Sequence, residues 1–107
     1  MQQTIFIEGA SVHYRTAGTG KSVMLLHGFG EDSHVWDGAV NFLKEKYKLI
    51  IPDLPGSGAS AMPGDISIEG MSMVAEAIRE AEGLEKFTLV GHSMGGYIAL
   101  AYAEKYP

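Results

Sequence analysis

The sequence has no cysteine among its 107 residues. Disulfide bonds and thiolate metal sites are therefore excluded, and a reducing compartment is compatible with this composition. No apolar run approaches the roughly 20 residues that a transmembrane helix needs. The segment after Met1 lacks a basic region followed by an apolar one, so we expect no signal peptide. These absences predict a cytoplasmic protein without a membrane partner.

Basic residues are scarce as well. Lys and Arg number 8 against 13 Asp and Glu, which gives a formal net charge of −5. The one basic cluster, Lys44, Lys46 and Lys48, is interrupted by Glu45 and Tyr47. Because nucleic-acid binding needs a coherent basic face, we expect no nucleic-acid partner. We interpret these lysines as the solvated end of a helix.

The residues that are present form an ordinary globular mixture. Hydrophobic residues make up 46% of the sequence and charged residues 20%, which is enough apolar mass for a core. A chain of this length suits one small domain or part of a larger one. The sequence contains no internal repeat, low-complexity tract or domain boundary, so residues 1–107 are predicted to belong to a single domain.

Apolar and β-branched runs predict five strands. Residues 4–7 and 11–16 predict a hairpin, with residues 17–20 as the next turn. Three apolar runs that stop beside Gly or Pro cover residues 23–26, 49–51 and 87–90. Such runs are typical of strands that are buried on both faces of a parallel sheet.

Apolar residues at three- and four-residue spacing predict helices between these strands. The patterns cover residues 36–47, 68–81 and 94–106, and the first follows a polar start at Asp32 and Ser33. Strands that alternate with helices predict an α/β fold, with a mostly parallel sheet of about five strands flanked by helices.

The most informative segment is Gly91-His92-Ser93-Met94-Gly95-Gly96. It contains Gly-x-Ser-x-Gly between a predicted strand and a predicted helix, the context of a nucleophile elbow. Because the chain must turn within about one residue, a side chain at position 91 or 95 would collide with the neighbouring strand or helix. The dipole of the following helix favours negative charge beside Ser93. Ser93 is therefore predicted to be a catalytic nucleophile; the alternative is a glycine-rich turn with an incidental serine.

A second glycine-rich segment, His27-Gly28-Phe29-Gly30, follows the predicted strand over residues 23–26. In an acyl-transfer enzyme a backbone N–H of this loop completes the oxyanion hole, and we expect Phe29 and Met94 to supply the two N–H groups. His27 could transfer protons, but we favour the role of bracing the loop through hydrogen bonds. Asp53, after the next strand, is expected to cap its own backbone.

Three segments in this order resemble the α/β-hydrolase family: the His-Gly-Phe-Gly loop, the loop over residues 53–60, and the elbow. The resemblance covers essentially the whole chain. It implies structural support of the loop and the elbow by five residues: Gly28, Gly91, His92, Gly95 and Gly96. The elbow looks most like that of small serine carboxylesterases, thioesterases and carbon–carbon bond hydrolases. Ser instead of Asp at position 93 argues against the dehalogenase and epoxide-hydrolase branches. The implied activity is hydrolysis of a small-molecule ester or thioester through an acyl-enzyme, without a cofactor.

The resemblance also implies that this chain is shorter than the members of the family. Family members are expected to be about twice this length, with an acid and a His after the nucleophile. We therefore expect residues 1–107 to be the N-terminal portion of one α/β-hydrolase domain, inactive by itself. The alternative is a non-catalytic hydrolase-like fragment that serves as a binding or association module. In the family topology residues 87–90 pair with a further strand, so we expect self-association, or pairing with the missing C-terminal half, through this edge.

The sequence gives weaker support for other kinds of site. Residues 15–22 end like a phosphate-binding loop, but Arg15 stands where the first glycine belongs and a strand follows. Residues 56–61 match a loose dinucleotide fingerprint, but residues 63–64 are Pro-Gly where a helix should begin. The polar side chains of residues 27–37 fit no recurrent metal spacing, so we expect no metal. Met71 and Met73 are interpreted as core or pocket filler.

Overall fold

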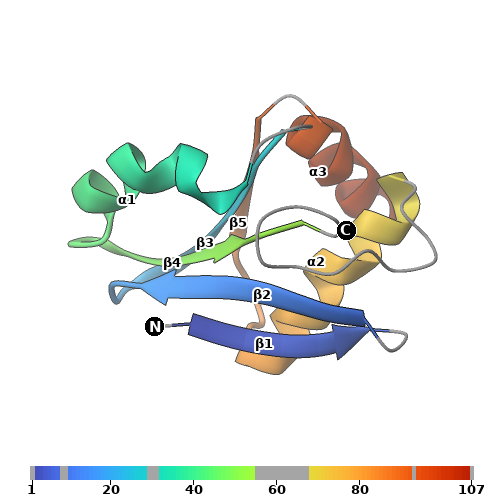
Figure 1. Ribbon diagram of the computed structural model, residues 1–107, viewed down its shortest axis with the longest axis horizontal. Coiled ribbons are helices and arrows are strands. Elements are labelled where there is room, and N and C mark those ends of the chain that lie inside the picture. The colour runs from blue at the N-terminus through green and yellow to red at the C-terminus, as the bar shows by residue number, and fades with distance from the viewer. Residues whose placement is uncertain (1, 8–9, 29–31, 55–67, 93, 107) are drawn as a thin grey trace.

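The computed structural model describes residues 2–7, 10–28, 32–54, 68–92 and 94–106. These residues form a sheet with helices on both sides (Figure 1). In chain order the elements are β1 (Gln2–Ile7), β2 (Ala10–Ala17), β3 (Lys21–Leu26), η1 (Ser33–Trp36), α1 (Asp37–Leu43), β4 (Tyr47–Pro52), α2 (Ile68–Glu82), β5 (Thr88–Gly91) and α3 (Met94–Lys105).

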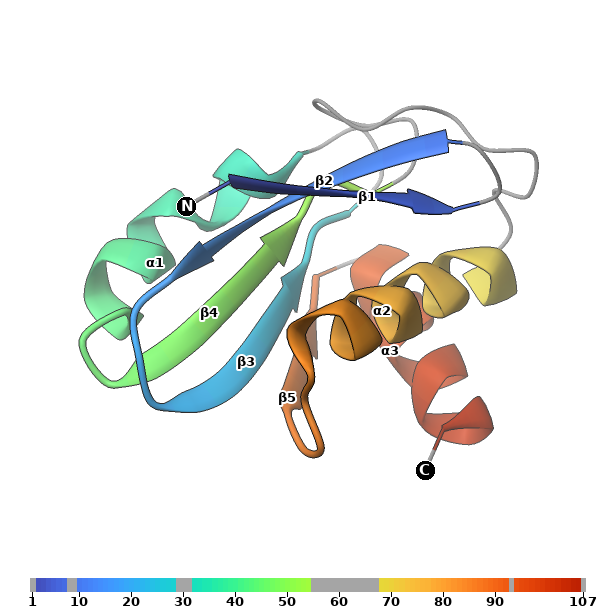
Figure 2. The ribbon, with the colours of Figure 1, turned by 90° about the horizontal axis from the view of Figure 1, so that it is seen from below.

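The sheet contains five strands in the order β1-β2-β4-β3-β5. β3 is parallel to both β4 and β5, whereas β2 is antiparallel to both β1 and β4. The predicted α/β fold is confirmed, with the N-terminal hairpin as the antiparallel part of the sheet. Figure 2 shows α1 on one side of the sheet and α2 and α3 on the other.

The turn after β2 depends on glycine. Gly18 and Gly20 have positive φ angles of 83° and 122°, a region that glycine enters without a steric penalty. A side chain at either position would also run into backbone carbonyl groups of the turn at residues 44–47. Lys21 then begins β3, so residues 15–22 connect two strands and lead into no helix.

The apolar parts of β3 and β4 are buried on both faces of the sheet, as predicted. On one face an apolar cluster packs under α2 and α3, with Met24, Leu26 and Ile50 from the sheet. On the other face Leu25, Leu49 and Ile51 pack against Val40 of α1. Each such side chain, fully buried, contributes about 1.5–3 kcal/mol to the free energy of unfolding.

β5 is one residue displaced from the prediction and is only partly buried, on one face. Leu89 packs against the cluster under α2 and α3, whereas Val90 on the opposite face remains 37% exposed. Val90 pairs with Leu25 of β3, but α1 lies over β3 and β4 and does not extend across β5 (Figure 2). The prediction of burial on both faces is therefore wrong for this strand within the described residues.

The first predicted helix is too long at its C-terminal end. α1 ends at Leu43, and Tyr47 begins β4. The spacing was misleading because Tyr47 contacts the same apolar cluster as Leu43, but from a strand. Lys48 is likewise in β4, where its Nζ lies 2.9 Å from Glu82 Oε1 of α2. The interpretation of Lys48 as part of a solvated helix end is wrong.

α2 agrees with its prediction and ends at Glu82, directly before Gly83, whose φ is +69°. Met71 is buried in the larger cluster, as expected for a core filler. Met73 is 45% exposed, because a shift of two residues turns a helical side chain away from that face. None of the helices in the described ranges is long and apolar enough to cross a membrane.

Candidate active site

The candidate site lies where β3, β4 and β5 end. Because these three strands are parallel, their carboxyl ends meet at one edge of the sheet, where α/β proteins bind their ligands. β3 is followed by His27, β4 by Asp53, and β5 by His92 and the N-terminus of α3 (Figure 2). Ser93 and Phe29 lie outside the described residues, so their predicted roles rest on the segments that flank them.

The elbow requires glycine at two positions. A Cβ atom built on Gly91 would overlap backbone atoms of Gly95 and Gly96. A Cβ atom built on Gly95 would lie 2.5 Å from the carbonyl oxygen of Leu26 and 2.8 Å from that of His27. Both distances are shorter than real Cβ contacts, so the predicted collisions at positions 91 and 95 are confirmed. Gly96 has only an ordinary contact of 3.7 Å and is under no such constraint.

Backbone hydrogen bonds tie the elbow to the end of β3. The N–H of His92 donates to the carbonyl oxygen of Leu26 over 3.0 Å, and the N–H of Gly95 donates to that of His92 over 2.9 Å. The side chain of His92 is exposed. Met94 is the first residue of α3, and the N–H groups of a helical first turn have no acceptor within the helix. The turn therefore presents the positive end of α3 to this edge of the sheet.

His27 braces two loops, as predicted. Its side chain is fully buried, and its Nε2 accepts a hydrogen bond of 2.9 Å from the N–H of Leu54. Since Nε2 is the acceptor, the ring proton is on Nδ1, which lies 2.8 Å from the carbonyl oxygen of Gly28 and donates to it. Both ring nitrogens are thus occupied by structural hydrogen bonds.

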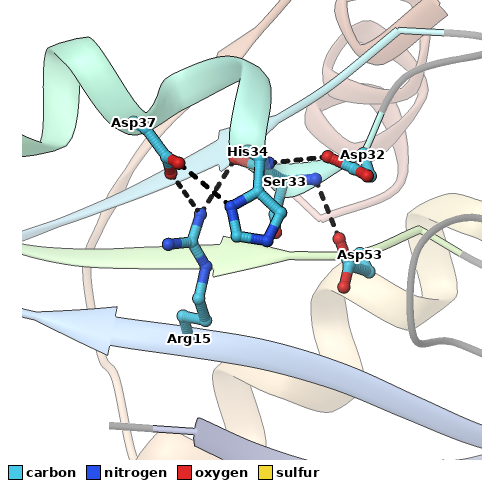
Figure 3. A network of polar contacts seen from close by, with 6 residues as sticks. All are labelled: Arg15, Asp32, Ser33, His34, Asp37 and Asp53. Carbon is cyan, nitrogen blue, oxygen red and sulfur yellow. Dashed lines mark hydrogen bonds and ion pairs between the residues drawn. The ribbon is translucent and has the colours of Figure 1, made fainter.

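The side chain of Asp53 bonds across the site to another loop. Its Oδ1 accepts a hydrogen bond of 2.8 Å from the N–H of Ser33, the first residue of η1 (Figure 3). The expectation that Asp53 caps its own turn concerns the backbone after residue 54, which lies outside the described residues, and stays a prediction. The N–H at the start of η1 needs an acceptor, and the fold brings the end of β4 close enough to supply one.

Arg15 is a further residue of this edge that the sequence did not single out. Its Nη2 donates to the carbonyl oxygen of Ser33 over 3.0 Å and to Asp37 Oδ1 over 2.9 Å (Figure 3). Asp37 also accepts a hydrogen bond from His34, and the bonds from His34 and Arg15 hold the pKa of Asp37 below its usual value. A charged residue in a β-strand of an amphipathic hairpin gives no local signal of this contact.

The acidic residues of this region have structural partners. Asp32 caps η1 through a 2.9 Å hydrogen bond from the N–H of His34, in agreement with the predicted polar helix start. Asp37 pairs with Arg15 and His34. No group of three or more His, Asp or Glu side chains in the described ranges is arranged to hold a metal ion.

A family model and two related proteins each match most of this chain. The family model described as the alpha/beta hydrolase fold matches residues 21–107. The pimeloyl-[acyl-carrier protein] methyl ester esterase of Nitrosomonas europaea is 36% identical over 99 residues, which cover 92% of this chain and 37% of that protein. The soluble epoxide hydrolase of a Corynebacterium species is 34% identical over 100 residues, 91% of this chain and 34% of that protein.

A solved esterase structure is similar to this chain in both sequence and fold. A thermophilic esterase from Thermogutta terrifontis is 36% identical and superposes with a TM-score of 0.90 over 97% of this chain and 41% of its own. The chain thus spans little more than a third of the length of these proteins, so the expected factor of two in length was too small. Since the family model covers most of the sequence and the fold agrees, the chain belongs to the alpha/beta hydrolase fold family.

Proposed function

We propose that this chain is the N-terminal part of a longer serine hydrolase, called the whole protein below, that acts on an ester or thioester through an acyl-enzyme. The observation that carries the proposal is the elbow: glycines 91 and 95 are sterically required on either side of Ser93, directly before the N-terminus of α3. A turn this tight places one side chain at the carboxyl edge of the sheet.

In the proposed reaction, the Ser93 hydroxyl attacks the acyl carbonyl carbon and loses its proton to a His. That His, and the acid that orients it, come from the remainder of the whole protein. The N–H groups of Met94 and Phe29 stabilise the oxyanion, assisted by the positive end of α3. The leaving alcohol or thiol takes the proton, and water then releases the acid from Ser93. No cofactor takes part.

The relatives carry the names of esterases and of an epoxide hydrolase at similar identity, so the choice between these substrates comes from position 93. Attack of a serine hydroxyl on an epoxide would leave an ether, which water does not hydrolyse. Attack on an ester or thioester leaves an acyl-serine, which water does hydrolyse. A carbonyl substrate is therefore favoured.

The experiment that tests this proposal measures hydrolysis of a short p-nitrophenyl ester by the whole protein. Ser93→Ala is expected to lower kcat by at least about 10⁴-fold, the order of loss when a triad nucleophile is removed. Ser22→Ala is the matched control, because Ser22 lies in β3 at the amino ends of the strands, beside Lys48 of β4. Wild-type activity in Ser93→Ala would disprove the nucleophile assignment.

The second candidate function is association through the β5 edge. Within the described residues β5 pairs only with β3, and Val90, Tyr97 and Leu100 are 37%, 69% and 70% exposed. A groove of about 950 Å³ runs between this edge and the helices α2 and α3, with Phe87, Leu89 and Leu100 among its lining residues. We propose that the remainder of the whole protein covers this edge, and that a second copy covers it when residues 1–107 are isolated.

A further inference from the structure

The peptide groups of Ser33 are held from both sides by two side chains, one from β2 and one from the residue that follows β4. The Asp53 carboxylate accepts the N–H of Ser33, and the Arg15 guanidinium donates to its carbonyl oxygen, over 2.8 Å and 3.0 Å (Figure 3). Ser33 itself is buried, with 1% of its surface exposed. We call this arrangement of Arg15, Ser33 and Asp53 the Ser33 clamp.

The clamp lies at one end of the loop after β3, and His27 lies at the other. The ring of His27 accepts the N–H of Leu54, the residue that follows Asp53. Both ends of this loop are therefore attached to the same pair of residues after β4. Leu54 is fully buried in the larger apolar cluster, so the attachment point is itself fixed by packing.

From this geometry we infer that Asp53 is a positioning residue for the oxyanion hole, with Arg15 as its partner on the other side of Ser33. The inference rests on the proposed function, in which the loop after β3 supplies the N–H of Phe29. Oxyanion donors act only at hydrogen-bonding distance from the developing charge, and small displacements cost large factors in rate. A side chain that fixes one end of the loop therefore affects kcat more than KM.

Asp32 offers a matched control. Its carboxylate also accepts a backbone N–H of η1, that of His34, over 2.9 Å. That bond spans two residues and closes a local turn, whereas the Asp53 bond joins the loop after β3 to the end of β4. Each side chain accepts a backbone N–H of η1, but only the Asp53 bond joins this end of the loop to the segment after β4.

The test compares four variants of the whole protein: Asp53→Ala, Asp53→Asn, Asp32→Ala and Ser93→Ala. For each variant, kcat and KM are measured with a short p-nitrophenyl ester, and thermal unfolding is followed. Asp53→Ala is expected to lower kcat about tenfold or more, below the roughly 10²–10³-fold loss of a complete oxyanion donor, with KM changed less than about threefold. Asp53→Asn is expected to recover most of kcat, because its amide oxygen accepts the same bond. Asp32→Ala removes the cap of η1 and is expected to lower the melting temperature, but to lower kcat less than about threefold.

The outcomes separate the two proposals. An active Ser93→Ala disproves the proposed function, and this inference falls with it. An inactive Ser93→Ala together with an Asp53→Ala variant of normal kcat overturns the inference alone. It is also overturned if Asp53→Asn is as impaired as Asp53→Ala, or if Asp32→Ala loses as much kcat. If Asp53→Ala does not fold, Arg15→Met releases Ser33 from the other side, and a normal kcat in that variant overturns the inference.

Discussion

The elbow after β5 and the loop after β3 lie at the same edge of the sheet, but they are held in place by different means. At the elbow, positions 91 and 95 have no room for a side chain, and two backbone hydrogen bonds, one to β3 and one within the turn, complete it. The loop after β3 is held by side chains of Arg15, His27 and Asp53. The elbow is therefore sensitive to added atoms, and the loop to lost hydrogen bonds.

The largest expected effect is on the elbow. Gly95→Ala places a Cβ atom against two backbone carbonyl oxygens of the β3 end and is expected to lower the free energy of unfolding of the whole protein by about 3 kcal/mol. Gly96→Ala is the matched control, since it has room for the methyl group and alanine is the better helix former by about 1 kcal/mol. Urea denaturation measures both, and equal destabilisation would refute the steric account.

A somewhat smaller effect is expected for the loop. His27→Ala leaves the buried N–H of Leu54 without its acceptor and is expected to lower the free energy of unfolding by about 2 kcal/mol. His34→Ala removes an exposed histidine whose ring pairs with Asp37 at the surface, and a change within about 0.5 kcal/mol is expected. The same denaturation experiment compares them, and a neutral His27→Ala would show that the ring does not brace the loop.

The sequence reveals the elbow and hides the Ser33 clamp, for a physical reason. The requirement for glycine at position 91 comes from neighbours within five residues, whereas that at position 95 comes from the end of β3. The Gly-x-Ser-x-Gly motif marks both positions, because the strand-to-helix turn is encoded in one short segment. The bond from Asp53 to Ser33 joins residues 20 apart, and an aspartate in a turn has a plausible local partner as well. The pairing of Lys48 with Glu82, 34 residues away, was missed for the same reason.

The burial of the strands could likewise be predicted only in part from the sequence. Apolar runs predicted β3 and β4 together with their burial on both faces, because packing on both sides selects apolar residues. The run over residues 87–90 predicted a strand but not its exposed face, which depends on how far α1 extends over the sheet. Periodicity also assigned Tyr47 to a helix, since strand and helix residues contribute to one cluster.

That exposed face allows a prediction about association. Val90→Lys places a charge at the β5 edge and is expected to weaken self-association of the isolated 107-residue chain about tenfold. Phe42→Lys is the matched control, because Phe42 is an 82% exposed apolar residue on α1 and not on β5. Light scattering across a dilution series measures the oligomeric state. A stable wild-type monomer at micromolar concentration would contradict this prediction.

The smallest expected effect concerns pH. The pKa of Asp37 is lowered in the folded chain, chiefly by the hydrogen bond from His34 and then by Arg15. A lowered pKa stabilises the fold above the unfolded-state value of about 4, and this contribution is lost as the pH falls through the folded-state pKa. Wild type is therefore expected to be slightly more stable than Asp37→Asn at pH 7, with a smaller difference at pH 2. Urea midpoints at the two pH values check this, and an unchanged difference would contradict the assignment.

The central claim is that the elbow presents Ser93 as a nucleophile, and covalent labelling tests it most directly. The whole protein is treated with a fluorophosphonate probe, which reacts with activated serines, and the modified peptide is identified by mass spectrometry. The account predicts one label on the peptide that contains Ser93, lost in Ser93→Ala and retained in Ser22→Ala. Equal labelling of Ser93→Ala, or a label on another residue, would contradict it.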